Sequence, residues 1–134
     1  MQQQEKQEQK RPELQHRSKG ENMTRINIAH KENGYSVIVE GHAENPLETT
    51  GNILCAAVSI LSYTLIEMIE HMRMEGQAAG WEIIDNGYVE AFVEPQNGFE
   101  EKVRAVIETI LKGFEILEEN YPEQIAVGEL HERN

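Results

Sequence analysis

A single cysteine and the lack of any long apolar run set the first limits on this 134-residue chain. One cysteine excludes an internal disulfide. An uninterrupted apolar stretch of about 18 residues, which a membrane span would need, is missing, and so is the apolar core of a secretory signal. These absences predict a protein of the reducing cytoplasm that is not inserted in a membrane.

Basic residues are also scarce. Twelve Lys and Arg stand against 24 Asp and Glu, which gives a formal net charge of −12. Because residues 1–22 hold five basic and four acidic side chains, residues 23–134 carry a net charge of −13. Such a surface repels the phosphates of nucleic acids and attracts basic partners. We therefore expect no direct binding of nucleic acid.

Apolar residues are almost absent from residues 1–22, where five of the first nine side chains are Gln. A segment of this kind buries too little apolar surface to offset its loss of conformational entropy, so we expect a disordered N-terminal extension. The remaining residues, 23–134, have room for one domain with a modest core, because the apolar fraction of the chain is 39%.

Two pairs of alternating apolar segments predict two β-hairpins. The first pair flanks residues 32–34 and the second flanks residues 85–87, and both connections have Asn-Gly at their centre. Helical spacing of apolar residues follows each pair, over residues 53–72 and 99–117, and residues 124–130 can form a last short strand. The expected order of elements is therefore β-β-α-β-β-α-β.

This order predicts an α+β fold. We expect a mainly antiparallel sheet with two helices packed on one face, because a sheet with two helices needs one of its faces covered by them. Gly76 and Gly80 break the first helical pattern, and we expect the second hairpin to start after them. The other face of the sheet would stay partly apolar, which favours a homodimer.

The best functional lead is a histidine and a cysteine that a short loop brings together. His42 ends the second strand, within Gly41-His42-Ala43, and Cys55 lies thirteen residues later at the start of the central helix. Asn52 is a good N-cap residue, which would place Cys55 at the third helical position. Unpaired N–H groups at a helix start favour a thiolate, and an imidazole can accept its proton. Cys55 is therefore a candidate nucleophile.

Plainer interpretations stand beside this one. A free cysteine is often a buried small hydrophobe, and His42 alone could be a solvated residue at a strand end. Ser59 either forms a hydrogen bond near the active site or bonds to the carbonyl four residues before it. One cysteine and scattered histidines supply too few ligands for a metal site, so we expect neither a metal nor another cofactor.

The motifs around these residues resemble those of a known family. The Gly-His-Ala stretch, the Gly-x-x-Ile/Leu-Cys-Ala-Ala-x-Ser stretch and the short gap between them are similar to the ribosomal-processing cysteine proteases called Prp, over roughly residues 23–130. The resemblance implies that His42 and Cys55 are the catalytic pair. It also implies a homodimer whose substrate is the precursor of ribosomal protein bL27, from which an N-terminal extension is removed.

Several neighbouring residues would support this chemistry. Gly41 and Gly51 bracket the expected loop, the small Ala56 would let a substrate backbone approach, and Ser59 carries over from the family motif. Many family members have an aspartate where this chain has Asn52, which can still orient an imidazole. This departure keeps a second hypothesis open, a ribosome-assembly or ribosomal-protein-binding module without catalysis. A third is other thiol chemistry, such as acyl transfer.

Overall fold

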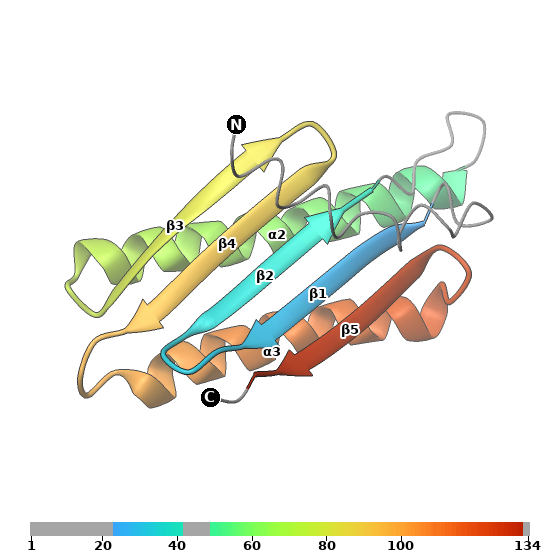
Figure 1. The fold of residues 1–134 in the computed structure, drawn as a ribbon. Coiled ribbons are helices and arrows are strands. Elements are labelled where there is room, and N and C mark those ends of the chain that lie inside the picture. The colour runs from blue at the N-terminus through green and yellow to red at the C-terminus, as the bar shows by residue number, and fades with distance from the viewer. Residues whose placement is uncertain (1–22, 42–48, 133–134) are drawn as a thin grey trace, which may run out of the picture.

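Two helices cover one face of a five-stranded sheet, as Figure 1 shows. The structure is a computed structural model that describes residues 23–41 and 49–132. Its strands are β1 (Thr24–His30), β2 (Tyr35–Glu40), β3 (Ala78–Asp85), β4 (Tyr88–Pro95) and β5 (Ile125–His131), and its helices are α2 (Thr49–Met74) and α3 (Glu100–Asn120). The predicted order of elements and the α+β class are confirmed. The prediction of disorder for residues 1–22 lies outside the described residues.

The sheet has the strand order β3-β4-β2-β1-β5. The pairs β1–β2, β2–β4 and β3–β4 are antiparallel, which agrees with the two predicted hairpins. The last pair, β1–β5, is parallel, so the sheet is mixed and not purely antiparallel. The reason is that α3 leads the chain back across the sheet, so β5 begins at the end of the sheet where β1 also begins (Figure 1).

The core lies between the sheet and the two helices. Alternate residues of β1 and β2 point into it, and Ile26, Ile28 and Val37 are almost fully buried. The helices contribute larger side chains, among them Leu65 of α2 and Phe114 of α3. Each such fully buried side chain stabilises the fold by about 1.5–3 kcal/mol. This packing fixes which face of α2 lies toward the sheet.

Two predicted boundaries are wrong. Gly80 lies inside β3, because a β-carbon at this position would approach the backbone oxygen of Phe92 to 2.3 Å, and glycine alone lets the two strands come so close. Helix α2 begins at Thr49, three residues before Asn52. A residue that suits an N-cap, such as Asn, can also lie inside a helix, so composition alone could not place the start.

Helix α2 has more apolar character than the sequence analysis predicted. Residues Ile53–Met74 have the length of a membrane span, and their most apolar 18-residue window has a mean hydropathy of 1.7, although Glu67 and Glu70 interrupt the apolar run. One third of the most apolar window is buried inside the molecule. The core helix of a soluble protein has the same length and composition, so this finding is weak evidence of a membrane span.

The outer face of the sheet is partly apolar, as predicted. Trp81 and Phe92 stack on it with ring centroids 6.1 Å apart, and Trp81 and Ile83 are 45% and 46% exposed. By alternation and register, Glu90 and Glu94 lie on the same face. The homodimer that this face favours is still a prediction.

Arg73 ties the end of α2 to β3. Its guanidinium donates hydrogen bonds to the Gly80 carbonyl, at 2.9 Å, and to the carboxylates of Glu82 and Glu70. The hydrogen bond to Glu82 raises the pKa of Arg73, and Glu70 raises it further, against the lowering effect of partial burial. The contact fixes the end of α2 against the sheet and so helps to orient the whole helix.

Candidate active site

Cys55 lies on the face of α2 that is turned toward the sheet. Val58, Ser59 and Ser62 follow it at helical spacing and share this face. Leu54 and Val58 are core residues, which anchors the helix on either side of the cysteine. The thiol is free and half-buried, so it is neither a fully buried core residue nor a surface group. The alternative in which Cys55 is only a buried small hydrophobe therefore loses support.

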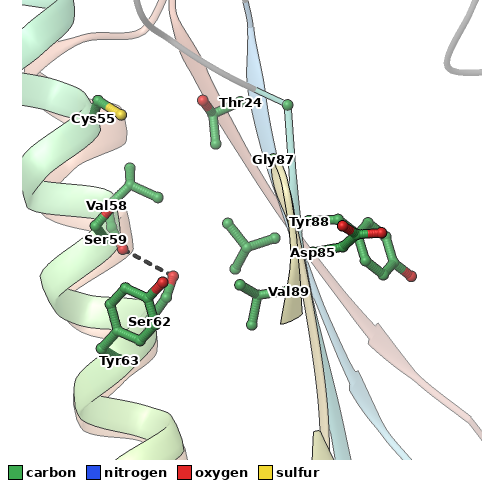
Figure 2. Close-up of a pocket in the computed structure, with 12 residues that line it drawn as sticks. Thr24, Cys55, Val58, Ser59, Ser62, Tyr63, Asp85, Gly87, Tyr88 and Val89 are labelled. Carbon is green, nitrogen blue, oxygen red and sulfur yellow. Dashed lines mark hydrogen bonds between the residues drawn. The ribbon is translucent and has the colours of Figure 1, made fainter. Parts of the chain in front are cut away.

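A pocket of about 110 Å³ lies between this helix face and the ends of four strands, β1 to β4. Figure 2 shows the Cys55 sulfur pointing from α2 toward the strands, with Thr24 and Gly87 on the opposite side. The described residues that line it are Thr24, Val39, Gly41, Cys55, Val58, Ser59, Ser62, Tyr63, Asp85, Gly87, Tyr88 and Val89. A thiol at the wall of such a pocket can reach a bound substrate.

Gly41 follows the last residue of β2 and lies at the rim of this pocket. Its N–H donates a hydrogen bond to the Gly87 carbonyl at 3.0 Å, and its φ of +94° is a conformation that favours glycine. A β-carbon here would lie 2.5 Å from the Met23 carbonyl oxygen. The chain therefore leaves the sheet beside the Cys55 pocket, and the next residue is His42. His42 itself lies outside the described residues, so the predicted pair is not tested.

The predicted roles of Asn52 and Gly51 at the helix start are wrong. Both residues lie within α2, and Cys55 is its seventh residue instead of its third. The free N–H groups of a helix belong to its first four residues, and the helix dipole acts mainly in the first turn. The helix start therefore offers Cys55 neither activation nor the N–H groups expected to bind an oxyanion.

The two serines of the pocket differ in their contacts. Ser62 is buried, and its hydroxyl donates to the Val58 carbonyl at 2.8 Å, four residues earlier (Figure 2). Ser59 is exposed at the pocket wall, one turn after Cys55. The bond to a carbonyl four residues back, which was one interpretation of Ser59, thus belongs to Ser62. Ala56 is exposed and is not among the described residues that line the pocket.

No described histidine lines this pocket. His30 ends β1, whereas Thr24, at the start of β1, lies at the pocket, so about 20 Å of strand separates the two. His71 follows Cys55 by sixteen positions on α2, which is roughly 24 Å along the helix axis. His131 ends β5, beside His30. Among the described residues, a histidine partner for Cys55 is therefore absent.

Sequence reasoning missed several residues of the pocket. Ser62 and Tyr63 follow Cys55 by seven and eight positions, so helical periodicity alone could have placed them on its face. Thr24, which is 2% exposed, reaches the pocket through the pairing of β1 with β2, and Gly87 through the hydrogen bond that it accepts from Gly41. No local signal marks those two. Asp85 and Tyr88 touch the pocket, but Figure 2 shows their side chains on the other side of the sheet from Cys55.

Solved structures with the same fold come from bacteria. SMU.848 from Streptococcus mutans is 26% identical, with a TM-score of 0.64 over 83% of this chain and 97% of that one. The essential ribosomal processing protease Prp from S. aureus, in complex with a substrate peptide, is 18% identical with a TM-score of 0.61, over 80% and 99% of the two chains. A second structure of that protease, with a covalently linked product peptide, has a TM-score of 0.59 at 18% identity, again over 80% and 99%.

A comparison of family models confirms the resemblance seen in the motifs. No match was found among the curated proteins. The model of the cysteine protease Prp, however, matches residues 23–126, which include the pocket and both predicted motifs. Because this match spans most of the sequence, the chain belongs to the family of the cysteine protease Prp.

Proposed function

We propose that this chain is a cysteine endopeptidase in which His42 and Cys55 form the catalytic pair. The observation that carries the proposal is that Gly41, the residue before His42, lines the same pocket as Cys55. Membership of the cysteine protease Prp family supports the reaction type. Because no histidine among the described residues lines the pocket, we assign the role of the base to His42.

The reaction proceeds through a thioester. The His42 imidazole takes the proton from the Cys55 thiol, and the thiolate attacks the carbonyl carbon of the scissile peptide bond. The imidazolium then gives this proton to the leaving amine as the C–N bond breaks. Water, deprotonated by the same imidazole, hydrolyses the thioester and restores the thiol. The Ser59 hydroxyl, one turn after Cys55, donates a hydrogen bond to the substrate at the pocket wall.

The proposed substrate is the precursor of ribosomal protein bL27, from which the enzyme removes the N-terminal extension in the cytoplasm. The related S. aureus protein is a ribosomal processing protease and was solved with a substrate peptide, which supports this class of substrate. Charge supports it too, because residues 23–134 carry a net charge of −13 and ribosomal proteins are basic.

The test is mass spectrometry of the extended bL27 precursor mixed with the chain or with its Cys55→Ala variant. We expect a shortened product with the parent chain and an intact precursor with the variant. The substitution removes one sulfur atom from a half-buried position, so the circular dichroism spectrum should not change. Cleavage by the variant at the parent rate would contradict the proposal.

A second candidate is a module that binds the precursor without cutting it. The observation in its favour is Asn52, at a position where many family members have an aspartate. The same experiment separates the two functions. A stable complex of parent chain and intact precursor, seen in a pull-down without any shortened product, would favour the binding module.

A further inference from the structure

Three potential metal ligands meet at the edge of the sheet, far from the pocket. The imidazole of His30 and the carboxylate of Glu129 are 2.6 Å apart, from Nε2 to Oε2, and His131 Nε2 lies 3.8 Å from the same oxygen. The two imidazole rings stack with centroids 4.0 Å apart and planes at 15°. Each of the three residues offers one nitrogen or oxygen atom as a ligand, and these three atoms all lie within 4.8 Å of one another.

Strand pairing builds this cluster. His30 and His131 are direct register partners in the parallel pair β1–β5, whose ends lie side by side in Figure 1. Glu129 precedes His131 by two residues, so its side chain emerges on the same face of β5. The histidines were expected to be scattered, and for His30 and His131 this expectation is wrong. A hundred residues of sequence separate them, but the register makes them neighbours.

The chemistry of the three groups suits a borderline transition metal. Imidazole and carboxylate together bind Zn²⁺, and two histidines with one carboxylate leave a fourth position for water. Ligand atoms about 2.0–2.2 Å from a tetrahedral Zn²⁺ lie roughly 3.4 Å apart. The observed 2.6 Å and 3.8 Å contacts are close to this spacing, but the two imidazole planes are nearly parallel and must tilt apart before both nitrogen lone pairs point at one ion. The His131 side chain is 68% exposed, so it can rotate to meet this requirement. His30 is held more firmly, by an edge-on contact with Tyr35.

We propose that His30, Glu129 and His131 form a Zn²⁺-binding site that fastens β5 to β1. On binding, any proton on a ligating nitrogen leaves to solvent, and the carboxylate exchanges its hydrogen bond for a bond to the metal. The site is structural, because it lies at the opposite end of β1 from the Cys55 pocket, about 20 Å away. It stabilises the folded chain, since the unfolded chain does not hold the two strands together.

Titration calorimetry of the full-length chain with ZnCl₂ tests the proposal. We expect one Zn²⁺ per chain and a melting temperature that rises with Zn²⁺ and falls back when EDTA is added. His30→Ala and His131→Ala should each weaken binding by at least the roughly 10–100-fold that loss of an outer-shell partner costs. Glu129→Gln should act in the same direction, and it keeps the size of the side chain if an alanine variant fails to fold.

Two controls make the outcome decisive. His71→Ala removes an exposed histidine of α2 and should leave Zn²⁺ affinity unchanged. Cys55→Ala removes the only thiol and should also leave it unchanged. If Cys55→Ala abolishes binding while the three cluster variants bind like the parent chain, the metal is held at the pocket and the proposal is overturned. Absence of any Zn²⁺ binding by the folded parent chain would overturn it equally.

Discussion

Cys55 differs both from a fully buried structural cysteine and from a surface cysteine. It is half-buried, which holds its side chain in place, and its sulfur points into a pocket that a substrate can enter. Because Cys55 is the seventh residue of α2, the helix start contributes little to its reactivity. Under the proposed function, it is therefore His42 that activates the Cys55 thiol.

For this reason, His42→Ala should slow the alkylation of Cys55 by iodoacetamide at neutral pH, because the thiolate is the reactive form and its proton acceptor is lost. The pH at which the rate is half-maximal should move upward. Rates measured across a pH series check this, with His71→Ala as the matched control. An unchanged rate profile in His42→Ala would mean that another group activates the thiol.

The two serines of the pocket give a second comparison at the residue scale. Ser59→Ala should lower kcat/KM for the precursor by roughly tenfold, about 1.4 kcal/mol, because it removes the proposed hydrogen bond to the substrate. Ser62→Ala is the control, because its hydroxyl already bonds to the Val58 carbonyl. Steady-state cleavage rates of both variants check the prediction, and equal losses would show that Ser59 has no special role.

At the scale of elements, α2 and β3 hold the pocket in shape. The guanidinium of Arg73 bonds to the Gly80 carbonyl and to Glu82, so the end of α2 cannot move without disturbing β3. Gly80 in turn lies against β4 and close to Ile69 of α2. The position of Cys55 along the sheet therefore depends on contacts made more than two helical turns away.

Gly80→Ala should destabilise the fold by about 1–3 kcal/mol, the usual cost of overpacking. The added methyl group would meet the backbone oxygen of Phe92 at 2.3 Å, and a backbone atom cannot move aside as a side chain end can. Urea unfolding of the parent chain and the variant measures the difference. Ala79→Ser, at an exposed position of the same strand, is the control and should change stability by less than about 0.5 kcal/mol.

At the scale of the whole molecule, two separate surfaces remain apolar. One is the outer face of the sheet around Trp81 and Ile83, and the other is an exposed stripe of α2 with Ile53, Ile60 and Tyr63. Exposing either surface to water does not stabilise a monomer, and exposed apolar patches often mark sites of interaction. Of the α2 stripe only Tyr63 lines the Cys55 pocket, whereas the sheet face lies on the other side of the sheet from that pocket and suits a second copy of the chain.

We therefore expect a homodimer in solution that pairs through the outer face of the sheet. Trp81→Glu should convert it to a monomer, because a buried and unpaired charge is costly at an interface. Ile60→Glu is the control, which adds the same charge on α2 at a residue that is 64% exposed. Light scattering coupled to size exclusion gives the mass of each form. Dissociation by Ile60→Glu alone would move the interface to α2.

Much of the fold could be predicted from the sequence because its signals are local. The two Asn-Gly hairpins, the helical spacing of apolar residues and the acidic surface each depend on residues that are neighbours in the chain. The family motifs also lie within twenty residues of one another, so Cys55 could be singled out from the sequence alone. Its half-buried place at a pocket wall agrees with that choice.

Other features depended on contacts that no local pattern records. The start of α2 was misplaced because a good N-cap residue such as Asn52 can also lie inside a helix, and Gly80 was misplaced because its role is a close approach of two strands. The sequence by itself determined the elements and the candidate nucleophile, through local spacing and residue chemistry. Only the tertiary structure decided that Thr24 and Gly87 face Cys55 and that His30 meets His131, because strand pairing joins residues that are distant in the chain.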